Sequence, residues 1–343
     1  MLKPFAIFRF DDPIIPSRYS AFIPLLFLIL LSLPAITFAN QNRYFQHKNV
    51  KITLVSTMLA DDGIGEWGFA AVIEAGENGQ YKVLYDTGSR PRTVLNNAAE
   101  LELDLTSIQH VVLSHHHGDH TGGLLSLRAA MKEAGSDALS KAHVAKGMFY
   151  PRPSRRGQRE TNSIFRKRER YQSLAGEFIE HATPTEILPG IWVGGPVKRI
   201  HQEENYGKGG RFIGPNGPMV DNVPESQALY IATDDGIIVI SGCGHAGIIN
   251  IFEQAKTVFG GEKILAAIGG FHLLKADQAT LAWTGEKMRA FDLRYFIGAH
   301  CTGLEAVYRL RELAGLSRNT AVVGAVGASF DLQSGIKPLL IAR

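Results

Sequence analysis

Cysteine is scarce in this chain of 343 residues, which contains only Cys243 and Cys301. Two thiols allow one disulfide bridge at most, so a disulfide-rich scaffold is excluded. A large excess of one charge is also missing, since 36 basic and 33 acidic residues leave a formal net charge of +3. Nucleic-acid binding needs a concentrated basic face, so this balance argues against a nucleic-acid partner. With 45% hydrophobic and 20% charged residues, the composition is that of a globular protein.

Long apolar runs are missing except near the N-terminus, where the 19 residues 21–39 are predominantly hydrophobic. Basic residues precede this run, and small residues end it at Ala39. This layout is typical of a signal peptide over residues 1–39 and predicts a periplasmic or secreted protein. The alternative is an uncleaved membrane anchor, because 19 residues are close to the shortest bilayer span. Two prolines in the run disfavour a continuous helix.

The rest of the chain alternates between strand-like and helix-like patterns, which predicts a layered α/β (α+β) fold. A hairpin, a helix and a strand follow one another in both halves, and no long linker divides residues 40–343. We therefore expect one domain there. The predicted strands are residues 50–55, 69–74, 81–85, 109–114, 227–240 as a hairpin, 264–268, 294–297 and 321–332. The predicted helices are residues 91–103, 122–134, 248–259, 279–291 and 304–314.

Residues 151–170 form a basic insert with eight basic and two acidic side chains. One interpretation is a solvated loop that leads into a helix. The other is a flap that receives an anionic group of a small-molecule substrate, because arginine side chains suit phosphate and carboxylate.

The most informative motif is Ser-His-His-His-Gly-Asp-His at residues 114–120, which holds four of the 12 histidines. Alternate residues of a strand lie on one side, so His115 and His117 can bind one ion while the histidine between them points away. A turn at the following glycine can bring Asp119 and His120 to a second ion. Imidazole and carboxylate suit zinc, with Mn²⁺ or Fe²⁺ as alternatives. The motif therefore predicts two divalent metal ions.

Three later segments place polar side chains beside glycine at the ends of apolar strands. They are Gly-Cys-Gly-His with Cys243 and His245, Gly-Gly-Phe-His with His272, and His-Cys-Thr-Gly with His300. We expect at least two of these histidines at the metals. A Cys243–Cys301 disulfide is an alternative in an oxidising compartment, and it would remove Cys243 from the metal ligands.

The histidine motif resembles the signature of the metallo-β-lactamase superfamily, and the resemblance covers most of the chain after residue 50. It implies a four-layer αββα sandwich with a metal site at one edge, between the two halves. The superfamily also has an aspartate at a strand end, which Asp86 in Tyr-Asp-Thr-Gly matches. The resemblance implies that Asp86 orients a ligand histidine without binding the metal itself.

The resemblance also guides the choice of the later ligands. In the superfamily a histidine precedes the second hairpin and an aspartate follows it, whereas residues 221–226 contain no histidine and Cys243 matches the aspartate. His245 can replace the missing histidine, and His300 matches the last ligand. The implied ligands are His115, His117, Asp119, His120, Cys243, His245 and His300. Asp119 and His272 are the implied catalytic residues, with His272 on a metal or over the substrate.

The later motifs are similar to those of the 7,8-dihydropterin-6-methyl-4-(β-D-ribofuranosyl)-aminobenzene-5′-phosphate synthase subfamily. Gly-Glu-Trp-Gly-Phe at residues 65–69 also resembles that subfamily, with Trp67 in place of its usual histidine. We expect an exported metal-dependent hydrolase that uses a metal-bound hydroxide on a phosphoester or lactone. One alternative is a transferase like the named synthase, and another is a non-catalytic metal- or ligand-binding protein.

Overall fold

The computed structural model describes residues 44–207 and 209–342. The predicted signal peptide and its cleavage site therefore lie outside the described residues. Within the described part of the chain, no helix has both the length and the hydropathy that a membrane span requires.

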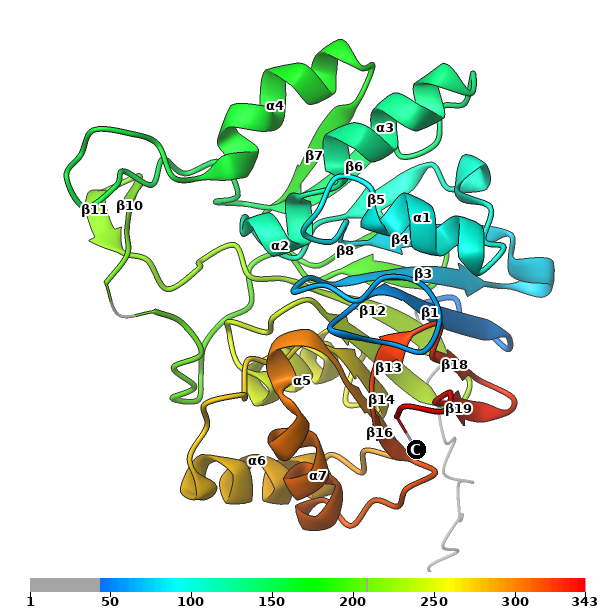
Figure 1. Cartoon of the computed structure of the whole chain (residues 1–343). Helices are drawn as coiled ribbons and strands as arrows, with labels where there is room; N and C mark the ends of the chain where they lie inside the picture. The colour runs from blue at the N-terminus through cyan, green and yellow to red at the C-terminus, as the bar shows by residue number, and fades with distance from the viewer. Residues whose placement is uncertain (1–43, 208, 343) are drawn as a thin grey trace, which may run out of the picture. The chain divides into compact units, whose positions relative to one another are not determined.

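Two large sheets form the centre of the fold (Figure 1). The first has eight strands in the order β19-β18-β1-β3-β4-β5-β6-β7. Its strands are β1 (Val50–Ser56), β3 (Ala70–Ala75), β4 (Tyr81–Tyr85), β5 (His110–Val112), β6 (Lys141–Ala145), β7 (Glu177–His181), β18 (Ser329–Asp331) and β19 (Gly335–Lys337). The second has seven strands in the order β16-β15-β14-β13-β12-β9-β8. Its strands are β8 (Thr185–Leu188), β9 (Ile191–Val193), β12 (Ala228–Thr233), β13 (Gly236–Ser241), β14 (Ile264–Gly269), β15 (Tyr295–Gly298) and β16 (Ala321–Val323).

Helices cover the outer face of each sheet (Figure 1). The first sheet packs against α1 (Thr93–Glu100), α3 (Leu124–Glu133) and α4 (Ser163–Ser173). The second packs against α5 (Ile248–Val258), α6 (Gln278–Ala290) and α7 (Leu304–Leu313). Each of these helix layers buries one apolar cluster against its sheet. A third apolar cluster fills the space between the two sheets. Both faces of each sheet are thus buried, which explains the nearly continuous apolar strands, and the predicted αββα sandwich is confirmed.

The strand register places the ends of several strands side by side. Strands β13, β14 and β15 are parallel, and Ser241, Gly269 and Gly298 pair at their carboxyl ends. In the other sheet β5 runs parallel to β4. The segments after these strands carry the predicted site residues. Parallel strands therefore deliver side chains that are far apart in the sequence to one edge of the sandwich.

The single closing strand predicted at residues 321–332 is wrong, because three short strands in three different sheets replace it. They are β16, β17 (Ala325–Val326), which pairs with β2 (Leu59–Ala60), and β18. The chain turns at glycine between them: Gly327 has a φ of +85°, and a Cβ at Gly324 would lie 2.6 Å from Leu54. Short strands β6 to β9 and the hairpin of β10 (Arg211–Gly214) and β11 (Gly217–Val220) were not predicted.

Candidate metal centre

The histidine motif forms the turn from β5 into the short helix α2 (Gly118–Thr121). Asp86, which follows β4, makes hydrogen bonds to this turn. Its Oδ1 accepts a hydrogen bond from the Ser114 backbone amide at 2.7 Å, and its Oδ2 accepts from the Ser114 hydroxyl at 2.7 Å. Oδ2 also accepts from His120 Nδ1 at 2.7 Å, which leaves the Nε2 lone pair of His120 free for a metal. Asp86 thus contacts His120, as expected of a residue that orients a histidine; that His120 binds a metal stays a prediction.

The first group of potential ligands consists of His115, His117 and His245, whose ligand atoms lie within 4.8 Å of one another. His115 Nε2 and His117 Nδ1 are 2.9 Å apart. The Nδ1 of His245 lies 2.5 Å from the backbone oxygen of Asn205, to which it can donate. Its buried Nε2 has no hydrogen-bond partner among the described residues. His245 is thus oriented as a metal ligand would be.

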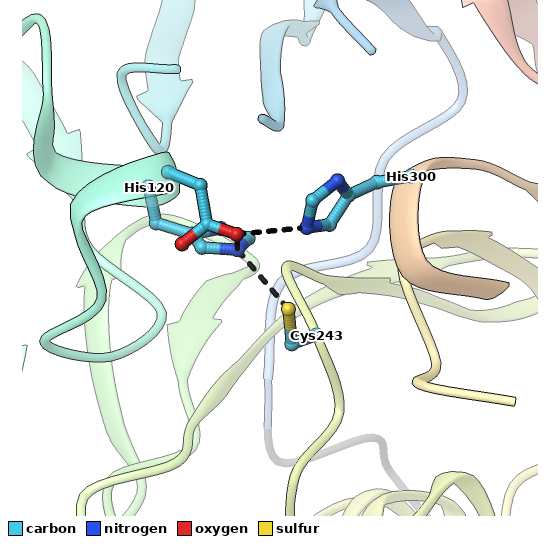
Figure 2. Close-up of side chains that lie close together, drawn as sticks. His120, Cys243 and His300 are labelled. Atoms are coloured by element: carbon cyan, nitrogen blue, oxygen red, sulfur yellow. Dashed lines mark hydrogen bonds and ion pairs between the residues drawn. The ribbon is translucent and has the colours of Figure 1, made fainter. Parts of the chain in front are cut away.

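The second group consists of Asp119, His120, Cys243 and His300, again with ligand atoms within 4.8 Å (Figure 2). His120 Nε2 lies 3.1 Å from Cys243 Sγ, and Asp119 Oδ2 lies 3.3 Å from His300 Nε2. Imidazole, carboxylate and thiol come from three different strand ends.

A third group, Cys243, His245 and His272, overlaps with the other two. Cys243 belongs to two groups and His245 to two, so the groups form one continuous cluster. The backbones of His272 and His300 have φ values of +49° and +45°. Non-glycine residues adopt this left-handed region rarely, and often at functional sites.

The residues present fit divalent metal ions. In the cluster, buried ring nitrogens without a hydrogen-bond partner among the described residues occur on His245, His272 and His300. His300 Nε2 does face Asp119, but not in hydrogen-bonding geometry. An unsatisfied buried polar atom costs about 1–3 kcal/mol, and a cation would relieve this cost. The seven predicted ligands and His272 all lie in these groups; that they bind metal stays a prediction.

The electrostatics of the cluster also favour metal binding. Burial, followed by the neighbouring histidines, lowers the pKa of His115, His117 and His245, so their rings are neutral as ligands must be. Burial alone would lower the pKa of His120, but the carboxylates of Asp86 and Asp119 outweigh it and raise this pKa to about 9. Without a metal ion, the His120 ring is therefore protonated, because the carboxylates of Asp86 and Asp119 favour a positive charge at this position.

Both cysteines are free thiols in the structure, so the alternative disulfide is not formed there. The Cys301 Sγ lies 3.8 Å from the backbone oxygen of Cys243. Cys243 faces the ligand cluster, whereas Cys301 accepts a hydrogen bond from the His272 backbone amide at 3.3 Å.

Two cavities flank the cluster. A cavity of about 1050 Å³ is lined by His272, Trp283 and residues 200–206. Another of about 790 Å³ is lined by His116 and His117 together with Arg155 and Arg211. Residues 200–206 line the first cavity, and residues 207 and 209–211 line the second.

The basic insert divides into two parts. Arg152 is buried and bound to carboxylates, with its Nε 2.8 Å from Asp221 and its Nη2 2.6 Å from Glu225. Arg155 is exposed and lines the smaller cavity. Most of the remaining basic residues lie on α4.

Three residues near the site were not assigned a role from the sequence. Glu66 is buried and accepts four hydrogen bonds, which fix the loop that carries Trp67. Trp67 is 49% exposed, and the centroid of its ring lies 4.7 Å from that of the His300 ring. Glu225 is fully buried against His116. Glu66 stands out as an acid in a glycine-rich stretch, whereas no local pattern signalled Glu225.

An αββα sandwich with histidines, a carboxylate and a thiol at aligned strand ends defines a class of metal-binding enzymes. The chain belongs to the metallo-β-lactamase superfamily, whose family model matches residues 68–192. It is 31% identical over 268 residues to a Methanocaldococcus jannaschii protein named 7,8-dihydropterin-6-methyl-4-(β-D-ribofuranosyl)-aminobenzene-5′-phosphate synthase, covering 75% of this chain and 89% of that protein.

Two further proteins are similar to this chain. An uncharacterised protein of the same organism is 29% identical over 262 residues, covering 76% of this chain and 91% of that protein. The crystal structure of a metal-dependent hydrolase of the β-lactamase superfamily aligns with a TM-score of 0.66 and 24% identity. That alignment covers 82% of this chain and 98% of the other, and it shows the shared fold.

Proposed function

We propose that the protein is an exported metal-dependent hydrolase of small ester-type substrates, phosphoesters or lactones, with zinc as its metal. The observation that carries the proposal is the pair of ligand groups, His115–His117–His245 and Asp119–His120–Cys243–His300, at one edge of the sandwich. Divalent ions bound there would supply a hydroxide nucleophile at neutral pH and a Lewis acid for the oxygen that becomes negative.

The side chains around the cluster supply the remaining chemistry. Asp119 directs Oδ2 to His300 and His120, so its other oxygen is available to orient water or accept a proton. His272 reaches the larger cavity and can place the leaving group there. The exposed ring of Trp67 covers His300 and limits the access of water to it.

An anionic substrate group fits the smaller cavity. Arg155 and Arg211 line it beside His117, and its acid Asp221 is already bound by Arg152. Arginine side chains bind phosphate and carboxylate in two-point contacts. We therefore place the anionic group there, with the reacting ester bond over the ligand cluster.

The test is hydrolysis of a panel of neutral and anionic esters by zinc-loaded protein. His117→Ala should abolish metal-dependent turnover, while His110→Ala, a histidine outside the ligand groups, should retain it. Absence of turnover on every ester, with no effect of His117→Ala, would refute the hydrolase. Turnover of any substrate excludes the non-catalytic binding protein.

Export is tested separately. N-terminal sequencing of protein recovered from the periplasm or medium should begin at Asn40. Full-length protein in the membrane fraction would support the uncleaved anchor, and full-length protein in the cytoplasm would refute export.

A transferase like the named relative is the second candidate, and the two cavities favour it. Joining two substrates requires a place for each, and a cavity lies on either side of the cluster. Incubation with a dihydropterin pyrophosphate and an aminobenzene ribose phosphate should then yield an adduct of the two and release pyrophosphate. Hydrolysis products alone would favour the hydrolase.

A further inference from the structure

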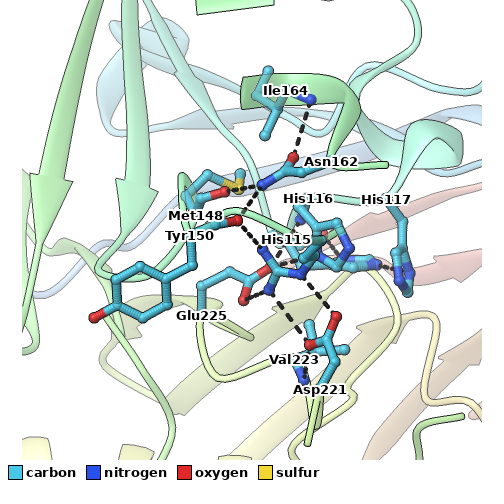
Figure 3. A network of polar contacts seen from close by, with 12 residues as sticks. His115, His116, His117, Met148, Tyr150, Asn162, Ile164, Asp221, Val223 and Glu225 are labelled. Carbon is cyan, nitrogen blue, oxygen red and sulfur yellow. Dashed lines mark hydrogen bonds and ion pairs between the residues drawn. The ribbon is translucent and has the colours of Figure 1, made fainter. Parts of the chain in front are cut away.

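A buried network of charges lies directly behind the metal-binding turn (Figure 3). The Oε1 of Glu225 accepts from His116 twice, from Nδ1 at 2.6 Å and from the backbone amide at 3.2 Å. Its Oε2 accepts from Arg152 Nη2 at 2.6 Å. The Nε of Arg152 donates in turn to Asp221 at 2.8 Å. Both oxygens of Glu225 are therefore used, one toward the turn and one toward the arginine.

The position of His116 gives this network a direct connection to the ligands. His116 lies between His115 and His117, which belong to one ligand group. Fixing both the backbone amide and the ring of the middle residue sets the backbone dihedral angles on either side of it. Those dihedrals set the directions in which the side chains of His115 and His117 leave the backbone.

The other end of the network is equally fixed. The backbone amide of Arg152 donates to the Glu160 carboxylate, and its backbone oxygen accepts from the Thr161 hydroxyl. Asn162 caps α4 and donates to the backbone oxygens of Met148 and Tyr150. The guanidinium therefore comes from a segment anchored to a helix, and it holds Glu225 in one place.

We propose that Glu225 is a positioning residue for the metal-binding turn: through His116 it holds His115 and His117 at the spacing that one metal ion needs, with Arg152 as its fixed partner. The inference rests on the proposed metal centre. It makes Glu225 specific to one ligand group, because the network does not reach Asp119, His120, Cys243 or His300.

Glu225→Gln tests this directly. An amide has one acceptor oxygen where the carboxylate has two, so it cannot accept from both His116 and Arg152. Partners that orient metal ligands typically contribute about 10- to 100-fold in metal affinity. We expect Glu225→Gln to weaken one of two ions by that factor. Asp221→Asn is the matched control, because it removes a charge from Arg152 without touching His116, and it should leave both affinities unchanged.

Cobalt substitution reports the two ligand groups separately. A thiolate-to-cobalt charge-transfer band reports the group with Cys243, and chelator competition gives the affinity of each ion. We expect Glu225→Gln to keep the thiolate band at one equivalent of cobalt while the other equivalent is lost to the chelator. Loss of the fold alone would instead weaken both ions together.

A second pair of variants tests the inference independently in case Glu225→Gln does not fold. His116→Asn keeps a side-chain donor for Glu225 and should retain affinity, whereas His116→Ala should lose it. The double variant of Glu225→Gln and His116→Ala should lose less affinity than the sum of the two single losses, because both variants remove the contact between the Glu225 carboxylate and the His116 ring. Additive losses, unchanged cobalt binding in Glu225→Gln, or an equal loss in Asp221→Asn would overturn the inference. If the unaltered protein takes up no metal, the proposed function fails first and the inference with it.

Discussion

The hydrogen bond between Asp86 and His120 allows a quantitative test of the site. The pair is fully buried, and its two atoms are 2.7 Å apart. Asp86→Asn keeps the size of the side chain but leaves one acceptor oxygen. The Ser114 backbone amide and His120 Nδ1 both donate to Asp86, so the amide can accept from one and presents its own N–H groups to the other. The substitution therefore removes the charge and one hydrogen bond together.

The magnitude follows from the pKa of His120 in the metal-free protein, which rises from 6.5 to about 9. A group whose pKa is higher in the folded state stabilises the fold fully below its unfolded pKa. Here that contribution is present below pH 6.5 and is lost as the pH rises through 9. At about 1.4 kcal/mol for each pKa unit, the contribution is roughly 3 kcal/mol. Asp86 raises the pKa of His120 more than Asp119 does. Most of this contribution to the free energy of unfolding should therefore disappear in Asp86→Asn.

The assay is urea unfolding of chelator-treated protein at several pH values between 6 and 9.5. We expect Asp86→Asn to lower the free energy of unfolding by about 2–3 kcal/mol at pH 6, and this difference should shrink as the pH rises. Asp331→Asn is the control, because Asp331 accepts hydrogen bonds from a turn and from no histidine. A difference between wild type and Asp86→Asn that stays constant over this range would refute the reasoning.

Three further predictions concern the loop, the cavity and the sheet. Glu66→Gln should lower the free energy of unfolding by about 1–3 kcal/mol in thermal melts, because an amide cannot accept the four hydrogen bonds that Glu66 accepts; an unchanged melting temperature would contradict this. Arg155→Ala with Arg211→Ala should raise KM about tenfold for anionic esters only; equal effects on neutral esters would exclude an anion-binding role. Burial, with its histidine neighbours, lowers the pKa of His143 to about 3. Its stabilising contribution is present above pH 6.5 and is lost toward pH 3, so His143→Asn should flatten the acid dependence of urea unfolding.

The first part of the candidate metal site could be predicted because four of its potential ligands lie within six residues of the sequence. Strand alternation predicted that His115 and His117 lie on one side and His116 on the other. The structure groups His115 with His117 and places His116 against Glu225, although β5 already ends at Val112. His245 and His300 were found by a weaker signal, a histidine beside glycine at the end of an apolar strand. That signal worked because the register of parallel strands aligns such ends.

Residues whose roles depend on distant pairing could not be found in this way. Glu225 is 109 positions from His116 in the chain, and no local pattern relates the two. The fold itself shows the same limit. Strands such as β6 and β8 are short and contain both polar and apolar side chains without a clear pattern. They form because neighbouring strands offer them hydrogen-bond partners. The closing strand failed for a similar reason, because close packing at Gly324 divides a continuous apolar run.

The two sides of the ligand cluster differ in charge. One ligand group contains only imidazoles, while the other contains a carboxylate and a thiol. The imidazole group adjoins the cavity with Arg155 and Arg211, and the acids nearest to that side, Asp221 and Glu225, are bound by Arg152. An anion that approaches through this cavity therefore meets cations and neutral rings before it meets a negative group. This distribution of charge would favour an anionic group on the imidazole side. In the proposed hydrolase, the leaving group would then be directed toward His272 and the larger cavity.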